Sequence, residues 1–221
     1  MGLGTVVVAS RNRGKVAELR RLLAPLPWRL LELDRAPDGA AVQWREDAGT
    51  YVGNATIKAQ TVAAATGLPA LADDSGIEIA ALGGWPGVET ATWMGEGASA
   101  AALLQGLLAR MQALPADRRG AAFVCVLALA LPDDTSAAAP VIVEGRLQGT
   151  VMAVPRGAGG FGYDPVFVPE GESRTLAEMP APAKDGYSHR GRAAHSLITL
   201  VENSRAPGAG YDEPHRGVAQ G

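Results

Sequence analysis

The amino-acid sequence predicts an α/β protein, because segments typical of strands and segments typical of helices follow one another along the chain. Short β-branched runs, such as TVVVAS at 5–10, are typical of buried strands. Apolar residues at helical spacing, as in SAAALLQGLLARM at 99–111, indicate amphipathic helices between the strands. With 221 residues, of which 47% are hydrophobic, the chain is long enough to bury a sizeable core.

The predicted elements begin with the strand at 5–10, which breaks at RNRG and is followed by a helix that ends before Pro25. Further strands are predicted at 28–33, 69–72, 76–81, 121–131 and 141–147, and further helices at 50–66, at 99–111 and from the capping residue Ser188. A hairpin-like loop is expected at 133–140 and a glycine-rich loop at 155–165. Because no composition shift marks a second domain, we expect one domain over 1–204 and a disordered Gly/Pro-rich tail over 205–221.

Charge and composition exclude several classes of protein. A formal net charge of −3 argues against a protein that coats nucleic acid. The longest strongly apolar run, 121–131, is shorter than the roughly 20 residues that span a bilayer. The single cysteine, Cys125, has no partner for an internal disulfide and is expected to be buried and inert. We therefore expect a soluble cytoplasmic protein that binds neither nucleic acid nor membrane.

Two polar segments in the first quarter of the chain could bind phosphate. ASRNRGK at 9–15 joins a strand to a helix, and such a junction points backbone N–H groups and a helix N-terminus at one place. A capped helix start with a solvated Lys15 explains the same residues. Asn54 and Lys58 are four residues apart and share a helix face, with Glu46 just ahead of the helix. A solvated polar edge is the alternative there.

The segment PALADDSGIEI runs an apolar strand into two adjacent carboxylates, Asp73 and Asp74. Side chains alternate between the two faces of a strand, so this pair can converge only if the strand ends there. Ser75-Gly76 is expected to supply the turn. A Mg²⁺ site completed by Glu46 would use such oxygen ligands, and a strand-terminating Asx turn is the alternative.

Two later segments could complete a nucleotide site. GGFGYDP combines glycines, which allow close backbone approach to a ligand, with Phe161 and Tyr163, which could stack on a base. KDGYSHRG gathers Lys184, His189 and Arg190 near a helix start. A turn with a packed aromatic ring and a capping box with solvated charges are the respective alternatives. Cations, carboxylates and aromatic rings together describe a site for a nucleoside triphosphate.

These motifs together resemble those of the inosine/xanthosine triphosphate pyrophosphatases, a family that cleanses nucleotide pools. The matching motifs are ASRNRGK, TYVGNATIKA, LADDSGIEIAALGGWPGV, FVCVLAL, GGFGYDPVF and SHRG, in the family's order over roughly residues 5–202. The sequence departs from the residues common in the family at Ser10, Arg11, Gly53 and Thr92, where Thr, Gly, Glu and Arg are usual.

The resemblance implies a mixed α/β fold in which an elongated central sheet with flanking helices forms two lobes around an active-site cleft. It implies a homodimer that hydrolyses ITP, dITP and XTP to the monophosphate and pyrophosphate with Mg²⁺, for which Mn²⁺ can substitute. An alternative enzyme is a Maf-like pyrophosphatase acting on modified pyrimidine or methylated nucleotides. The alternative from another class is a catalytically silent nucleotide-binding module.

The resemblance also implies roles for individual residues. Glu46, Asp73 and Asp74 are expected to bind the metal, with Asp74 also the general base and Lys58 a second catalytic residue. The substrate is expected to be bound by Ser10, Arg11, Asn12, Arg13, Gly14, Lys15, Asn54, Lys58, Ser75, Phe161, Gly162, Tyr163, Asp164, Lys184, His189 and Arg190. Donors in the His189-Arg190 segment are expected to select the 6-oxo group of hypoxanthine or xanthine over the amino group of adenine.

Overall fold

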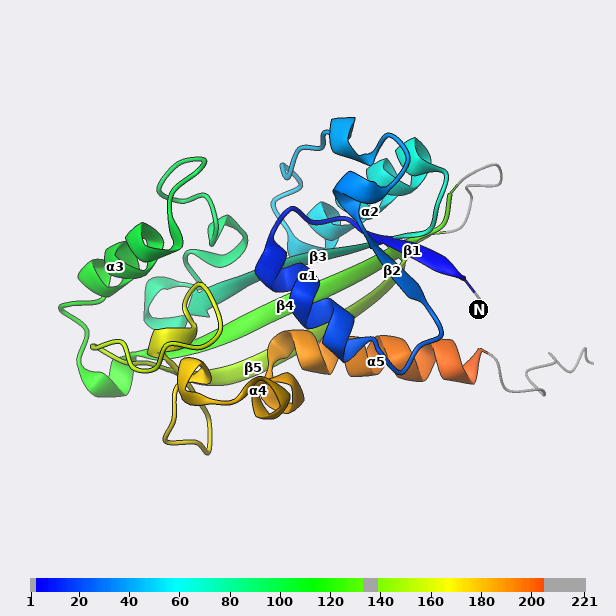
Figure 1. Ribbon diagram of the computed structural model, residues 1–221. Helices are drawn as coiled ribbons and strands as arrows, with labels where there is room; N and C mark the ends of the chain where they lie inside the picture. Colours follow the sequence, from blue (N-terminus) through cyan, green and yellow to red (C-terminus); the bar gives the residue numbers. More distant parts are fainter. Residues whose placement is uncertain (1–2, 133–138, 205–221) are drawn as a thin grey trace, which may run out of the picture.

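The computed structural model describes residues 3–132 and 139–204 (Figure 1). Most of the hairpin-like loop expected at 133–140 and the whole tail at 205–221 therefore lie outside the described residues. Within the described part, no helix is long and apolar enough to cross a membrane.

A six-stranded mixed sheet forms the centre of the molecule, in the strand order β2-β1-β3-β4-β5-β6. The strands are β1 (Thr5–Val8), β2 (Arg29–Glu32), β3 (Ala70–Ile79), β4 (Gly120–Ala130), β5 (Val141–Val151) and β6 (Phe167–Pro169). β1 runs parallel to β2 and β3, whereas the pairs β3–β4, β4–β5 and β5–β6 are antiparallel. Parallel neighbours need a crossover connection, and a helix follows β1 in the sequence and another precedes β3.

The helices cover the sheet unevenly. They are α1 (Arg13–Leu22), α2 (Tyr51–Thr66), α3 (Ala100–Arg110), α4 (Ala181–Tyr187) and α5 (His189–Asn203). α1 and α5 share one hydrophobic core with Leu71 and Leu127, and α2 shares another with Ala72 and Val126, on the opposite face of the same strands. α3 lies at the far end of the long strands, where it packs with Ile77 and Phe123 (Figure 1). The sheet thus carries separate cores at its two ends, as expected of an elongated two-lobed molecule.

Most predicted elements are confirmed within a few residues. The strands predicted separately at 69–72 and 76–81 are one continuous strand, β3. The sequence did not predict β6 and α4, which are short and carry little periodic signal. The final helix does begin behind Ser188, whose hydroxyl oxygen accepts a hydrogen bond from Gly191 N at 2.9 Å.

The turn expected at Ser75-Gly76 is wrong. β3 continues through both aspartates to Ile79 and pairs with β4 along its whole length. Asp73 and Asp74 therefore project to opposite faces of the sheet, where each meets its own cations. Because each carboxylate is paired with its own cations, the strand can hold two adjacent buried aspartates without ending there.

The second half of β3 lies at an open edge of the sheet. β1 pairs with β3 only at Ala70 and Leu71, and beyond them the described part of this edge has only an isolated bridge between Glu78 and Pro86. A loop covers part of it, and Thr90 Oγ1 accepts a hydrogen bond from Ile77 N at 2.9 Å. Beyond the end of β1, the start of α1 reaches β3, where Lys15 contacts the buried Asp73.

Candidate active site

A cavity of about 430 Å³ lies between the N-terminal ends of α1 and α5, the middle of β3 and the glycine-rich loop. Its polar and aromatic lining comprises Asn12, Lys15, Ser75, Thr90, Phe123, Phe161, Tyr163, Asp164, Lys184, His189 and Arg190. These residues come from six separate segments of the sequence. The fold thus brings together the motifs at both ends of the chain.

Asn12 organises the start of α1 at one wall of the cavity. Its side-chain oxygen accepts hydrogen bonds from Gly14 N at 2.9 Å and Lys15 N at 3.2 Å, as an N-cap residue does. Asn12 N in turn donates to Ser10 Oγ at 3.2 Å. The cap directs the first turn of α1 toward β3, where Lys15 Nζ lies 2.5 Å from Asp73 Oδ1.

Asp73 is a buried anion held by cations. Arg190 Nε donates to its Oδ2 at 2.7 Å, and the Cys125 thiol lies 3.2 Å from the same oxygen. Burial alone would raise the pKa of Asp73, but the charges of Arg190 and Lys15 hold it well below its ordinary value. Asp73 therefore remains ionised, and Cys125 is buried as expected but contributes to this site.

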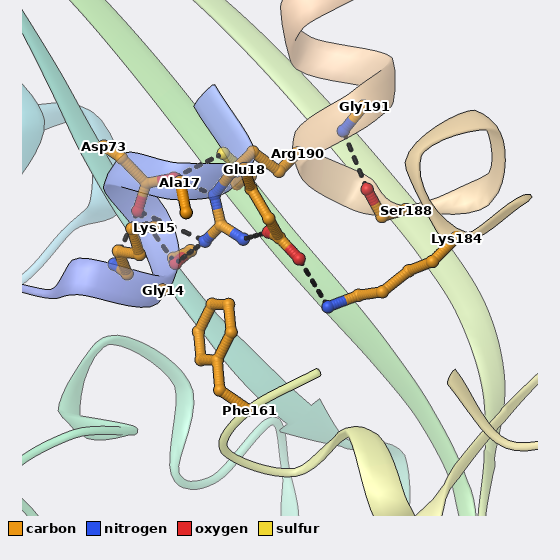
Figure 2. Close-up of polar contacts among 12 residues, drawn as sticks. Gly14, Lys15, Ala17, Glu18, Asp73, Phe161, Lys184, Ser188, Arg190 and Gly191 are labelled. Atoms are coloured by element: carbon orange, nitrogen blue, oxygen red, sulfur yellow. Dashed lines mark hydrogen bonds and ion pairs between the residues drawn. The ribbon is translucent and has the colours of Figure 1, made fainter. Parts of the chain in front are cut away.

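Glu18 joins these charges into a longer network (Figure 2). Its two carboxylate oxygens accept hydrogen bonds from Arg190 and from Lys184, each at 2.5 Å. Lys184 Nζ also donates to Asp164 Oδ2 at 2.6 Å. From Lys15 to Asp164, cations and anions alternate through the buried wall of the cavity. Such a network is stable only while every member keeps its partners.

Asp74 lies on the other face of β3, toward α2. Lys58 Nζ lies 2.8 Å from Asp74 Oδ1 and 3.2 Å from Glu46 Oε2, so one ammonium group holds both carboxylates. Asn54 Nδ2 approaches Asp74 Oδ2 at 3.4 Å. Burial raises the pKa of Asp74 to about 6, against the opposing charge of Lys58. A carboxylate in this range is suited to accept a proton near neutral pH.

Aromatic rings also line the cavity. Phe161 lies so close to α1 that a Cβ added at Gly14 would come within 2.7 Å of its ring, which explains the glycine. His189 stacks on Phe123 with ring centroids 4.7 Å apart. Burial and the charge of Arg190 lower the pKa of His189 well below its ordinary value, so the imidazole is neutral. Its Nδ1 atom is buried without a hydrogen-bond partner among the described residues.

Comparison with known proteins places this arrangement in a family. The model of the Ham1 family matches residues 6–200. The chain belongs to the Ham1 family. It is 46% identical over 198 residues to a dITP/XTP pyrophosphatase of Streptomyces coelicolor, covering 89% of this chain and 96% of that protein. A second dITP/XTP pyrophosphatase, from Thermus thermophilus, is 46% identical over 202 residues, covering 91% and 94%.

Solved Ham1 structures have the same fold. A HAM1 protein from Coxiella burnetii superposes with a TM-score of 0.78 at 39% identity, covering 90% of this chain and 99% of that one. The Ham1 protein of Staphylococcus aureus gives the same TM-score at 29% identity, covering 91% and 100%. The mixed α/β fold expected from the sequence is therefore confirmed.

Six residues expected to bind substrate do not line the cavity of this Ham1 chain: Ser10, Arg11, Arg13, Gly14, Asn54 and Lys58. Asn54 and Lys58 contact Asp74 on the other face of β3. Ser10, Arg11 and Arg13 instead border a groove of about 750 Å³ between α1 and the segment after β2. Arg11 donates to Val42 O at 2.5 Å and lies over the Trp44 ring, 4.5 Å from its centroid. These side chains therefore lie apart from Lys15, which lines the cavity.

The three carboxylates expected to bind one metal ion do not converge. Asp73 is separated from Glu46 and Asp74 by the strand itself, and the described residues contain no group of three metal-binding side chains. Glu46 and Asp74, however, share Lys58. Mg²⁺ is commonly held by one or two carboxylates together with substrate phosphates, so this pair fits the ion and Asp73 does not.

Sequence reasoning missed Glu18. One signal was available, because Glu18 follows Lys15 by three residues and therefore shares its face of α1. The apolar residues around it make α1 an ordinary amphipathic helix, and a glutamate on such a helix normally faces solvent. Its burial depends on Arg190, which lies 172 positions away in the sequence, and no local pattern reports that contact.

Proposed function

We propose that this Ham1 protein hydrolyses ITP, dITP and XTP to the monophosphate and pyrophosphate. The observation that carries the proposal is the pairing of Asp74 and Glu46 through Lys58, beside a cavity with cationic and aromatic walls. Relatives about 46% identical over most of the chain are dITP/XTP pyrophosphatases. Hydrolysis of a nucleoside triphosphate uses the carboxylate pair, the cationic wall and the aromatic wall. A silent nucleotide-binding module has no use for a buried general base such as Asp74.

In the proposed reaction, Asp74 accepts a proton from the water that attacks the α-phosphorus. The new phosphorus–oxygen bond forms as the bond to the bridging oxygen breaks, and that oxygen leaves with pyrophosphate. Lys58 orients Asp74 and attracts the phosphate chain, and Lys15 supplies a second positive charge. When bound by Glu46 and Asp74, Mg²⁺ supplies further positive charge against the developing negative charge of the phosphates.

We propose that the purine base of the substrate lies at the aromatic end of the cavity. The guanidinium of Arg190 already donates to Asp73, Glu18 and Ser75, so it serves mainly to fix the network. His189 is neutral and has a buried ring nitrogen to spare. We propose that the His189 segment donates to the 6-oxo group, because an amino group in that place would leave a buried donor unpaired at a cost of about 1–3 kcal/mol.

Pyrophosphate release from a panel of triphosphates tests the proposal. ITP, dITP and XTP should be turned over far faster than ATP, GTP and dTTP. Fastest turnover of a methylated or modified pyrimidine nucleotide would favour a Maf-like enzyme instead. Tight binding of ITP without any turnover would indicate a silent module. We also propose that the protein is a cytoplasmic homodimer. A monomer mass in analytical ultracentrifugation would contradict the dimer.

We expect activity to depend strictly on Mg²⁺ or Mn²⁺. The cluster around Asp74 offers only carboxylate ligands, which suit hard divalent cations. Excess EDTA should abolish pyrophosphate release, and added Mg²⁺ should restore it. Appreciable turnover in EDTA would contradict the metal assignment.

A further inference from the structure

Tyr51 begins α2 and lies on the helix face that serves the site. Residues three and seven positions further along that helix are Asn54 and Lys58, so the three side chains form one stripe. Asn54 and Lys58 both reach Asp74. Tyr51 lies one turn nearer to the helix N-terminus, and its side chain therefore meets β3 next to Asp74.

The hydroxyl group of Tyr51 lies over Gly76. A Cβ added at Gly76 would come within 2.7 Å of the Tyr51 hydroxyl oxygen and 2.5 Å of Thr90 Oγ1. Gly76 follows Asp74 by two residues, so it belongs to the same face of β3, and it also lines the cavity. The hydroxyl is thus placed at the open edge of β3, between Asp74 and the loop at Thr90.

This hydroxyl oxygen is buried and has no hydrogen-bond partner within the described part of the chain. Buried polar groups are almost always paired, because leaving one unpaired opposes folding. Tyr163 shows the usual arrangement, since its hydroxyl donates to Thr90 O and accepts from Trp93 Nε1, both at 3.1 Å. For packing alone, phenylalanine would fill the place of Tyr51 without this penalty.

The hydroxyl is suited to donate. Burial, together with the nearby carboxylates of Glu78 and Asp74, raises the pKa of Tyr51, so the group stays protonated. The hydroxyl of Thr90, which also lies close to Gly76, already donates to Gly87 O at 2.5 Å. A donor is therefore left over at a place beside the proposed general base.

We propose that Tyr51 is a substrate-binding residue whose hydroxyl donates a hydrogen bond to a phosphate oxygen of the nucleoside triphosphate. The inference rests on the proposed function, which brings the α-phosphate to Asp74. The phosphate chain is the part of that substrate with many charged acceptors, and Lys58 on the same helix stripe attracts it. Binding then satisfies a donor that the free protein leaves unpaired.

The test compares Tyr51→Phe with Tyr187→Phe. Both changes remove one hydroxyl, but Tyr187 is 39% exposed on α4 and does not line the cavity. Binding of the α,β-methylene analogue of ITP is measured by titration calorimetry, and inosine is measured as a competitor. Tyr51→Phe should weaken the analogue about 10- to 100-fold, as expected for a lost bond to a charged group, and leave inosine unchanged. Tyr187→Phe should change neither.

Thermal melting of the free proteins separates binding from a structural role. Since the lost hydroxyl was unpaired, Tyr51→Phe should melt at the wild-type temperature or above it. Unchanged affinity for the analogue, an equal loss of affinity for inosine, or a lower melting temperature would each overturn the proposal. Pyrophosphate release by the wild type is scored separately. If the wild type releases no pyrophosphate, the proposed function is wrong. If the wild type is active and Tyr51→Phe binds the analogue as tightly as the wild type does, only the role of Tyr51 is wrong.

Discussion

At the scale of single residues, the neighbouring aspartates of β3 have opposite properties because they face opposite ways. Asp73 has a pKa held well below its ordinary value, whereas burial raises that of Asp74 to about 6. Two carboxyl groups whose environments separate their pKa values can take different roles. Asp73 anchors the cations of the buried network, and Asp74 is available as a base.

The roles of Asp74 and Lys58 can be separated by kinetics. Asp74→Asn keeps the shape of the side chain but removes its basic oxygen, so kcat should fall on the order of 10²–10⁴-fold. Lys58→Ala should raise KM as well, because it removes a contact made before and during the reaction. Single-turnover kinetics, with thermal melts as a folding control, measure both effects. Near-normal kcat in Asp74→Asn would show that another group activates the water.

Glu18 should be important for stability. Glu18→Gln removes the anion between Arg190 and Lys184, so these two buried cations keep only Asp73 and Asp164 as counter-charges. Breaking such a pair destabilises proteins by about 3–5 kcal/mol. The matched control is Glu32→Gln, which affects a more exposed pair with Arg20 and should cost less than about 1 kcal/mol. Urea denaturation measures both, and equal losses would contradict the assignment.

At the scale of elements, the start of α5 is fixed by its close approach to β5. A Cβ added at Gly145 would clash with His189 O and lie 2.5 Å from Ala193 N. Both neighbours are helix backbone, which cannot rotate away as a side chain can. The absence of a side chain at Gly145 therefore positions the His189-Arg190 segment against the sheet.

Gly145→Ala should accordingly displace α5. We expect a loss of about 1–3 kcal/mol in stability, as for other overpacked sites, together with reduced affinity for ITP. Gly120→Ala is the control, because a Cβ at Gly120 on β4 meets no atom within 4 Å. Denaturation and KM measurements on both variants check this. If Gly145→Ala behaves as Gly120→Ala does, the contact between α5 and β5 is not a constraint on the site.

At the scale of the whole molecule, the cavity depends on both ends of the sheet. Its walls include Lys15 from α1, a helix that packs in the core shared with α5, and Leu103 from α3, which packs in the core at the far end of the long strands. A ligand that occupies the cavity therefore contacts both lobes and stabilises only the folded arrangement.

Substrate analogues should raise the melting temperature. At 100 times its dissociation constant, the α,β-methylene analogue of ITP adds about 2.7 kcal/mol of stability, or about 5–10 °C for a chain of this size. Inosine at the same concentration should shift the melting temperature much less, because it lacks the phosphates that Lys15 and Lys58 attract. Differential scanning calorimetry compares the two. Equal shifts would contradict a phosphate site at these lysines.

The sequence by itself determined the features that depend on neighbouring residues. Apolar periodicity predicted α2, α3 and the long strands, because an element that buries one face has apolar residues at its own helical or strand spacing. Cap residues marked helix starts, as at Ser188, since a cap acts within a single turn. The motifs around Lys15, Asp74 and His189 were likewise visible as candidates for nucleotide chemistry before any contact was known.

Only the tertiary structure decided which of these candidates work together. It continued β3 through Asp73 and Asp74, assigned them to different faces, and separated Asp73 from the carboxylates of Glu46 and Asp74 that share Lys58. It buried Glu18 against Arg190 and left the hydroxyl of Tyr51 unpaired beside Gly76. These outcomes depend on contacts between remote segments. The cost of burying a charge or a hydroxyl is set by the partners that packing provides, and a local sequence pattern carries no record of them.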